Sequence, residues 1–415
     1  MKQEWYKKKW AVVVIHTAVW LLLFSLPYLL RPSFSGGEQP QREMRNETAG
    51  FFIMRLNDLL LVGFFYLNAL VLFPRLVYKR RYVLYLLVVA ASFYLLSRYE
   101  EYLPHEKDEY GRYAYYNSLA AREGFLQLPL INIWVKDFAG SLQQRFPGFT
   151  YQLPGPGVEL TYDIDIAYSY KHKGLIRNLG GFMKRPSLER IKVLLGLNKD
   201  PFDSYDWLDQ QHADVWKPVF FFLVAQQNGP YDKNIGPYKK AMWELVARHS
   251  KKYRVGLHPS WQSGDRPSLL TKEKEQLEAM SDQAVTLSRQ HYIRFHLPST
   301  YQQLIAAGIT DDYSMGYGSI NGFRASVAAN YNWYNLEAEE ETGLRIHPFC
   351  FMDANSYYEQ KLSAAAAFDE MLRLYTVCRQ YNGLFHSIWH NNFLGTDKAF
   401  AGWREIYARF IAQVQ

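Results

Sequence analysis

Short apolar runs alternate with longer amphipathic runs after the turn-rich sequence PGPG at residues 154–157. The apolar runs have the length of β-strands and lie at residues 158–164, 219–224, 253–257, 292–295, 309–313, 344–352 and 384–389. The amphipathic runs have the length of helices and include residues 237–251, 272–289 and 361–381. Such alternation is typical of a parallel sheet covered by helices. We therefore expect an α/β fold, a distorted (β/α)7-type barrel that is not fully closed.

Polar residues recur where these expected strands end. They are Asp163, Asp165, His258, Asp311, Asp312, Asp353 and His390. Barrel folds carry their chemistry at the C-terminal ends of the strands. The recurrence therefore predicts one shared site at that end of the barrel.

Three apolar runs precede the barrel, at Trp10–Leu30, Leu56–Phe73 and Tyr82–Leu96. A transmembrane helix needs about 20 apolar residues, which the first run satisfies best and the third least. The first run lacks a small-residue cleavage site, which argues against a removable signal peptide. These runs predict an α-helical transmembrane segment, and the alternative is that they are core helices of a soluble domain.

Lysines and arginines flank the first run on its N-terminal side and separate the second run from the third. By the positive-inside rule the N-terminus then lies in the cytoplasm. Three spans would place the barrel on the non-cytoplasmic side of the inner membrane, whereas two spans would leave it in the cytoplasm. The lipid bilayer is thus an expected partner.

The net charge of +7 could indicate nucleic-acid binding, but no stripe of Lys and Arg interleaved with aromatic residues is present. We therefore expect no nucleic-acid partner. The two cysteines, Cys350 and Cys378, have no metal or redox spacing and are expected to be buried.

Two resemblances concern the N-terminal part. The sequence FFYLNALVLFPRLVYKRRYVLYLL resembles the membrane portion of LytS-type sensor histidine kinases, but no phosphoacceptor region or ATP-binding glycine boxes follow, so no kinase activity is expected. Residues 97–138 resemble the end of an accessory domain in Bacteroidetes-type polysaccharide-deacetylase-like proteins. The resulting division is a membrane segment at 1–96, a truncated accessory domain or linker at 97–154, and a barrel at 155–415.

The motifs TYDIDI, GLHPSW, SRQHYIRF, ITDDYSMGYGSINGFR, HPFCFMDA and SIWHNN occur in the barrel region. Each is weak alone, but their order resembles that in polysaccharide deacetylases of the NodB-homology group. The resemblance implies a hydrolase that uses a divalent metal, with zinc expected, to remove acetyl groups from amino sugars of a polysaccharide.

Residue roles follow from the same motifs. The resemblance makes Asp163 the general base and makes Asp165 and His258 metal ligands. The family's second histidine would stand four residues after His258, where this chain has Gln262, so we consider His291 as the substitute ligand. The alternatives are a turn-capping role for the aspartates and a structural role for the histidines.

The remaining site residues come from the later motifs. His390 matches the general acid, and an ordinary histidine pKa of about 6.5 suits proton donation near neutrality. Arg289 resembles the arginine that orients the base. Expected substrate contacts are Trp261, Arg324, Trp389 and Asp353. Asp353 could instead orient His390, Arg324 could form a structural ion pair, and the tryptophans could be core residues.

The motifs leave other functions open. A protein that keeps the barrel but has lost the metal would be a catalytically degenerate carbohydrate-binding protein, which Gln262 favours. A membrane sensor with the barrel as its input domain is a further alternative, as is a chimeric chain. The substrate could be peptidoglycan, a capsule or lipopolysaccharide sugar, or a chitin-like oligomer.

Overall fold

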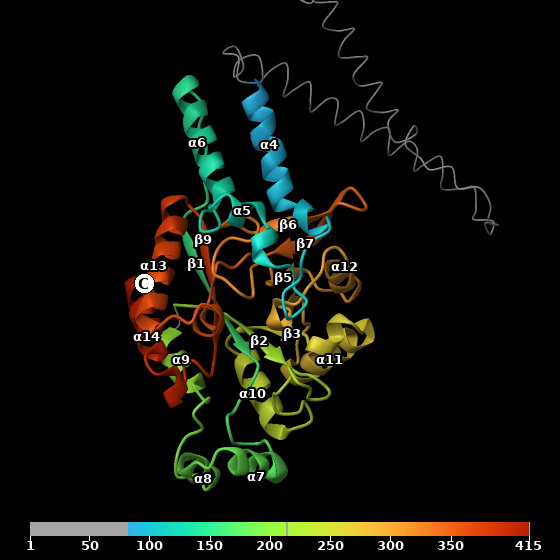
Figure 1. Cartoon of the computed structure of the whole chain (residues 1–415), viewed down its shortest axis with the longest axis vertical. Coiled ribbons are helices and arrows are strands. Elements are labelled where there is room, and N and C mark those ends of the chain that lie inside the picture. Colours follow the sequence, from blue (N-terminus) through green and yellow to red (C-terminus); the bar gives the residue numbers. More distant parts are fainter. Residues whose placement is uncertain (1–81, 213–214, 415) are drawn as a thin grey trace, which may run out of the picture. The chain divides into compact units, whose positions relative to one another are not determined.

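The computed structural model describes residues 82–212 and 215–414, and Arg80–Gln415 form one compact unit. Its centre is a nine-stranded sheet with the order β6-β7-β5-β4-β3-β2-β1-β9-β8 (Figure 1). The strands are β1 (Gly157–Ile164), β2 (Val219–Leu223), β3 (Arg254–His258), β4 (Leu287–Ser288), β5 (Asp311–Asp312), β6 (Tyr331–Asn335), β7 (Glu340–Ile346), β8 (Phe351–Met352) and β9 (Leu384–His390). All neighbours pair in parallel except β6 and β7. The expected α/β class and parallel core are confirmed, and β6 and β8 form the two ends of the sheet.

Helices surround the sheet or project from the two ends of the unit (Figure 1). They are α4 (Tyr82–Leu96), α5 (Leu119–Arg122), α6 (Leu130–Arg145), α7 (Leu175–Lys184), α8 (Leu188–Leu194), α9 (Tyr205–His212), α10 (Lys240–Ser250), α11 (Pro267–Ser281), α12 (Ser299–Ala306), α13 (Ala364–Gln380) and α14 (Trp403–Val414). Strand β2 shows why the strand sequences are apolar throughout and do not alternate with polar residues. Phe220 and Phe222 belong to the large core cluster, whereas Phe221 packs on the other side with Leu287 and Tyr313. Both faces of a central parallel strand are buried, so both must be apolar.

Two of the predicted secondary-structure elements are wrong. The strand expected at residues 292–295 is a single 3-10 turn, His291–Ile293, whose middle residue Tyr292 has φ 59°. The true strand β4 lies within the helix expected at 272–289, because that helix ends at Ser281, where Asp282 takes a left-handed conformation. The run at 344–352 is also divided, into β7 and β8.

The apolar runs Trp10–Leu30 and Leu56–Phe73 lie outside the described residues. The third run is helix α4, and no helix among residues 82–212 and 215–414 is both long and apolar enough to cross a membrane. Near its C-terminal end α4 packs on the barrel. Leu95 is buried there, and the ring of Phe93 lies 5.2 Å from that of Tyr334 on β6.

A buried ionic network holds the segment after α4 against the barrel. The Glu101 carboxylate accepts hydrogen bonds from Arg98 Nε at 2.7 Å and from Arg324 Nε and Nη2 at 2.8 and 2.5 Å. Arg98 also pairs with Glu100 at 2.8 Å. All four side chains are almost fully buried. Burial alone would raise the pKa of Glu101, but the two guanidinium groups lower it to about 2.

Replacement Glu101→Gln should therefore lower the free energy of unfolding by about 3–5 kcal/mol, because it leaves two guanidinium groups buried with one fewer counter-charge. The folded-state pKa of Glu101 lies below its ordinary value of 4.5, so its contribution is complete above that pH and is lost as the pH falls toward about 2. Urea unfolding at neutral and acidic pH measures both effects. Glu123→Gln, an exposed residue of the same segment, is the control; equal losses in both variants would contradict the network's role.

Candidate active site

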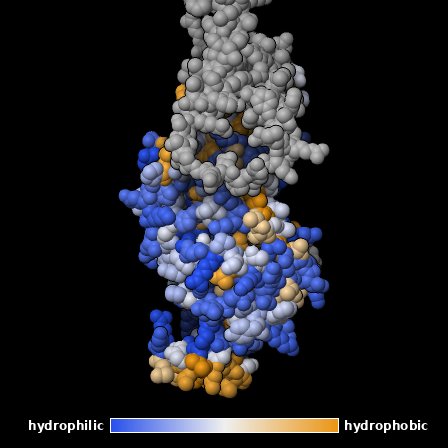
Figure 2. Space-filling view, turned by 90° about the vertical axis from the view of Figure 1, so that its right-hand side faces the viewer, coloured by the Kyte–Doolittle hydropathy of each residue, from blue (hydrophilic) through white to orange (hydrophobic). Residues whose placement is uncertain are grey.

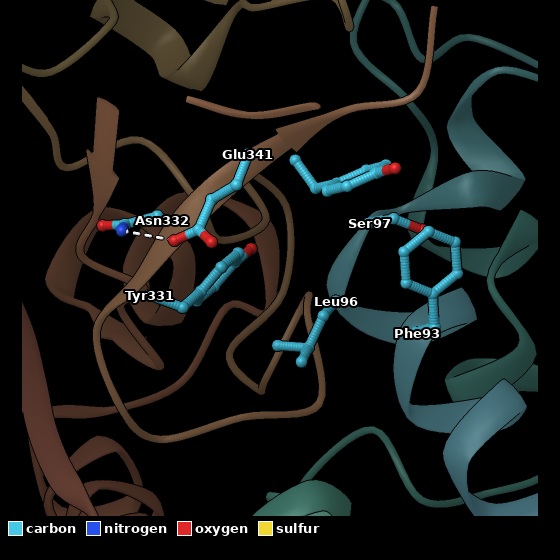
Figure 3. A pocket seen from close by; sticks show the side chains of 7 residues that line it. Phe93, Leu96, Ser97, Tyr331, Asn332 and Glu341 are labelled. Atoms are coloured by element: carbon cyan, nitrogen blue, oxygen red, sulfur yellow. Dashed lines mark hydrogen bonds between the residues drawn. The ribbon is translucent and has the colours of Figure 1, made fainter. Parts of the chain in front are cut away.

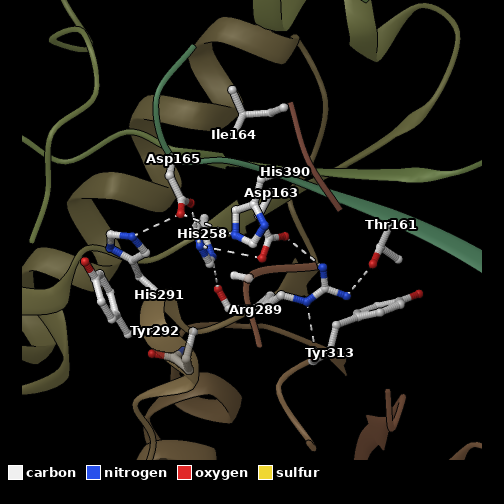
Figure 4. Close-up of polar contacts among 12 residues, drawn as sticks. Thr161, Asp163, Ile164, Asp165, His258, Arg289, His291, Tyr292, Tyr313 and His390 are labelled. Carbon is white, nitrogen blue, oxygen red and sulfur yellow. Dashed lines mark hydrogen bonds and ion pairs between the residues drawn. The ribbon is translucent and has the colours of Figure 1, made fainter. Parts of the chain in front are cut away.

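Four strand ends bring the predicted acid, base and ligand residues together (Figure 4). Asp163 lies near the end of β1 and pairs with His390, the last residue of β9. Asp165 lies two residues after Asp163, just beyond β1. His258 is the last residue of β3, and Arg289 directly follows β4. Because parallel strands end at the same edge of the sheet, these side chains meet there, as the sequence predicted.

Asp165, His258 and His291 form a group that could hold a metal ion. One ligand atom from each lies within 4.8 Å of the others. His258 Nε2 is 3.0 Å from Asp165 Oδ1, and His291 Nε2 is 3.5 Å from Asp165 Oδ2. His291, which we considered as the substitute for the ligand that Gln262 does not supply, belongs to this group, and its role as a ligand stays a prediction.

The hydrogen bonds of this group fit a cation. Asp165 Oδ1 is buried and accepts no hydrogen bond. His258 Nδ1 lies 2.5 Å from the carbonyl oxygen of Arg289, which fixes its proton on Nδ1 and leaves the lone pair of Nε2 facing Asp165. Two imidazole nitrogens, each on a ring held at Nδ1 by another group, and a carboxylate oxygen are donors that zinc and similar divalent ions prefer.

His291 is oriented by a residue that the sequence analysis missed. Its Nδ1 lies 3.0 Å from Asp232 Oδ1, which also accepts the backbone N–H of Trp261 at 2.9 Å. Burial lowers the pKa of His291, but Asp165 and Asp232 together raise it to about 9. Asp232 lies in the loop after β2. Among the first three predicted strands, β2 alone had no polar residue predicted at its end, and this difference could have directed the search to the loop that follows it.

Asp163 is held by Arg289. Nη1 of Arg289 donates to Asp163 Oδ1 at 2.7 Å, Nη2 donates to Thr161 Oγ1 at 2.7 Å, and Nε donates to the carbonyl oxygen of Tyr313 at 3.0 Å. The guanidinium carbon lies 4.4 Å from the centre of the Phe221 ring. The other carboxylate oxygen of Asp163, Oδ2, is 3.8 Å from His258 Nε2 and therefore faces the ligand group.

His390 approaches Asp165 from the other side. Its Nε2 is 3.5 Å from Asp165 Oδ2, while its Nδ1 and backbone nitrogen donate to the two oxygens of Asp353 at 2.6 and 2.7 Å. Burial lowers the pKa of His390, but the Asp353 carboxylate raises it to about 10. The imidazole is therefore protonated at neutral pH. Asp353 is fully buried, so its carboxylate cannot contact a ligand directly. Its contacts are with His390, whose ring it orients.

Two of the expected substrate contacts lie elsewhere. Arg324 is buried at 1% exposure and its donors are taken by Glu101 and the carbonyl oxygen of Gly316. Trp389 is fully buried and packs against Phe351 and Tyr407. Neither side chain can reach a ligand in the Asp165 group without a rearrangement of the core.

Trp261, by contrast, belongs to a half-buried aromatic rim beside His291. Its ring stacks on Tyr231 with centroids 3.9 Å apart, and the Tyr292 ring lies 4.7 Å from the His291 ring. Tyr110, from the segment before the barrel, lies 5.2 Å from Tyr292 and 6.3 Å from Trp261. Tyr110 could not be identified from the sequence, because nothing local links it to residues so far along the chain.

Arg112 fixes Tyr110's segment to this rim. Its Nη1 donates to the carbonyl oxygens of Tyr292 and Gly318 at 3.0 Å each, and its Nε pairs with Asp108 at 2.6 Å. The guanidinium also lies over the ring of Tyr110, 4.6 Å from its centre. The mouth of the site is therefore built partly from residues that precede the barrel.

A separate pocket of about 270 Å³ lies between α4 and the β6–β7 pair (Figure 3). It is lined by Phe93, Leu96, Ser97, Tyr331, Asn332, Tyr334 and Glu341. Asn332 donates to Glu341 at 2.6 Å on the β6–β7 side of the pocket. None of the residues around Asp165 lines this pocket.

Residues 52–147 match a family of unknown function (DUF7033). The match runs across residue 96, and the three-part division of the chain stays a prediction. No curated protein matches the chain, so the resemblance of the first hundred residues to LytS-type kinases has no support.

The chain is similar in structure to a Mycobacterium smegmatis protein described as a polysaccharide deacetylase, with 14% identity and a TM-score of 0.42, over 64% of this chain and 86% of that one. Puue allantoinase gives 10% identity and a TM-score of 0.42 over 65% and 89%. A polysaccharide deacetylase from Bacillus cereus gives 10% and 0.33 over 62% and 87%. Similarities this low do not bear on chemistry, which has to be argued from the side chains of this chain.

Asp232→Asn should weaken zinc binding by roughly 10–100-fold. An amide at this position offers no full charge to His291 and can present its NH2 group to Nδ1, which would favour the wrong tautomer. Competition with a chromophoric chelator at neutral pH measures the affinity. Asp265→Asn is the control, since Asp265 is an exposed carboxylate that pairs with Arg294. Unchanged affinity in Asp232→Asn would remove Asp232 as an orienting group.

Proposed function

We propose that this protein is a metal-dependent hydrolase that removes acetyl groups from N-acetylated amino sugars of a cell-envelope polysaccharide. The observation that supports it is the convergence on Asp165 of Nε2 atoms from His258 and His291, with the Asp163 carboxylate and the protonated His390 beside them. Amide hydrolysis needs these parts: a metal site, a base for water and an acid for the leaving nitrogen.

The residues that would hold the ion are Asp165, His258 and His291, with zinc as the preferred occupant. A divalent ion in this position supplies Lewis-acid polarisation of the acetyl carbonyl and lowers the pKa of water. Imidazole ligands bind metal only when neutral, so the raised pKa of His291 makes metal binding compete with protonation as the pH falls.

Proton transfers are assigned to the flanking residues. Oδ2 of Asp163 accepts the proton of the attacking water, while Arg289 holds Oδ1 and keeps the carboxylate turned toward the ligand group. Nε2–H of His390 donates its proton to the departing nitrogen, and Asp353 stabilises the imidazolium beforehand. An acid of this kind suits an amine leaving group, which cannot depart as an anion.

The aromatic rim supports a sugar substrate. Tyr292 contacts His291, and Tyr110, Tyr231 and Trp261 contact Tyr292. All four residues are half-buried and therefore partly open to a ligand. Flat apolar sugar faces pack well on such rings. Trp261 keeps its role as a substrate contact in this proposal, whereas Arg324 and Trp389 serve packing.

For localisation we propose an inner-membrane protein, anchored through the apolar runs Trp10–Leu30 and Leu56–Phe73. The support is the length of these runs and the distribution of Lys and Arg around them.

Asp163→Asn should lower acetate release from zinc-loaded protein and N-acetylglucosamine oligomers by about 10²–10⁴-fold, because the amide cannot accept the proton. Zinc content should stay at the wild-type level, since Asp163 is outside the ligand group. The exposed Asp369→Asn on α13 provides the control. Undiminished turnover would exclude Asp163 as the base.

Asp353→Asn should move the alkaline limb of the pH–rate profile to lower pH by about 1–3 units, since the carboxylate raises the pKa of His390. His390 acts in its protonated form, so activity is lost as the pH rises through its pKa. The profile of kcat against pH measures the shift. An unshifted alkaline limb would show that His390 is not the acid or that Asp353 does not set its pKa.

A second candidate is a catalytically degenerate carbohydrate-binding or membrane-sensor protein that keeps the barrel. The observation that favours it is Gln262, which stands where the resembled family has its second histidine. Metal analysis after reconstitution with zinc separates the two functions. Protein that binds sugar oligomers but retains no zinc, cobalt or nickel would favour the second.

A further inference from the structure

Helices α7 and α8 form a hairpin, here residues 171–199, that projects from the barrel at the end of the unit opposite to α4 and α6 (Figure 1). Its outer side is apolar and unusually exposed. Leu175 is 84% exposed, Ile176 88%, Met183 76%, Leu188 77%, Leu195 70% and Leu197 71%. Figure 2 shows the resulting hydrophobic patch at the lower end of the molecule.

In α7 and α8 the apolar side chains are exposed, which is the reverse of the usual arrangement in a soluble domain. Arg177 joins the hairpin to the rest of the unit by donating to the carbonyl oxygen of Lys233 at 2.9 Å. Arg190 joins α8 to α7 by donating to the carbonyl oxygen of Asn178 at 2.9 Å. Asn178 is buried and donates to the carbonyl oxygens of Tyr170 and Gly174. A surface helix normally places its apolar face on the core. Here that face is directed outward, which is typical of an interaction site.

The hairpin is held firmly at its base. Asp200 is 1% exposed and accepts the backbone N–H groups of Ser169, Tyr170 and Lys171 at 2.7, 2.8 and 2.9 Å. The residues entering and leaving the hairpin are thereby tied to each other. The apolar face is thus presented by a fixed structure.

The hairpin is also strongly cationic. It contains Lys171, Lys173, Arg177, Lys184, Arg185, Arg190, Lys192 and Lys199, against the single acid Glu189. Lys184, Arg185 and Lys192 are exposed, and no ion pair or side-chain hydrogen bond to another described residue is found for them. Exposed leucines flanked by unpaired lysines and arginines are typical of helices that lie in a membrane interface.

We propose that the α7–α8 hairpin binds the surface of an anionic phospholipid bilayer. The apolar side chains enter the headgroup and acyl boundary, and Lys184, Arg185 and Lys192 contact lipid phosphates. The positive charge of the hairpin argues against a second copy of this chain as its binding partner, because two hairpins would bring the same unpaired cations face to face. This binding is independent of the deacetylase function and of the apolar runs before residue 82.

The test uses the full chain with one introduced cysteine, Ile176→Cys, carrying an environment-sensitive dye. Both native cysteines are buried, so only position 176 is labelled. Vesicles of equal parts phosphatidylcholine and phosphatidylglycerol should shift the emission to the blue, whereas phosphatidylcholine vesicles alone should not. Ile305→Cys on α12, where the native side chain is 41% exposed, is the matched control and should not respond. The dye reports locally, so anchoring by another segment cannot imitate the result.

Charge reversal adds a second measurement. Lys184→Glu, Arg185→Glu and Lys192→Glu should each weaken the dye response to the anionic vesicles roughly fivefold. Leu188→Cys on α8 repeats the labelling if the first variant does not fold. A dye at position 176 or 188 that stays in water with anionic vesicles would overturn the proposal. So would a blue-shifted emission without vesicles, which would show that protein already covers the hairpin.

Discussion

Three imidazoles share one carboxylate, and the rest of the site depends on how each imidazole is held from behind. Nε2 of His258, His291 and His390 all point at Asp165. The group behind each ring differs. A carbonyl oxygen lies behind His258, a carboxylate that also accepts the Trp261 N–H lies behind His291, and the Asp353 carboxylate lies behind His390. Together with Asp165, these two carboxylates raise the pKa values of His291 and His390. The proposed division between ligands and acid rests on these three partners.

Asp163, in β1, and Asp165, just after the strand, can lie close together because each has its own positive partner. Residues two apart on a strand point to the same side, which would leave Asp163 and Asp165 repelling each other. Arg289 neutralises Asp163, and its remaining donors are satisfied by Thr161 and a carbonyl oxygen, so a fully buried guanidinium is tolerated. Asp165 is left for the imidazoles and for a cation. One oxygen of Asp163 remains turned toward that cation's position.

The sequence predicted the parts of this arrangement that lie at strand ends. Asp163, His258 and His390 end long strands with clear apolar patterns, and parallel pairing brings such ends together without further information. Strand β4 has only two residues and leaves no periodic pattern, so its position was misassigned even though Arg289 beside it was identified. Asp232 and Tyr110 could not be found this way, because their contacts arise between loops. Arg324 shows the opposite failure. Arg324 was predicted to contact the substrate, but its guanidinium donates hydrogen bonds to Glu101, which lies 223 residues earlier in the chain.

The segment before the barrel is therefore part of the site's architecture. Glu101 joins it to the barrel through a buried charge network, and Arg112 joins it again at the rim through the carbonyl oxygens of Tyr292 and Gly318. Between these attachments, Tyr113 packs in a small core with Tyr317 of the barrel. Tyr110 is positioned by this double attachment, because its ring lies under the Arg112 guanidinium and against Tyr292. The same contacts that stabilise the segment also place an aromatic ring at the mouth of the site. In this chain one set of interactions contributes both to the stability of the fold and to the shape of the site's mouth.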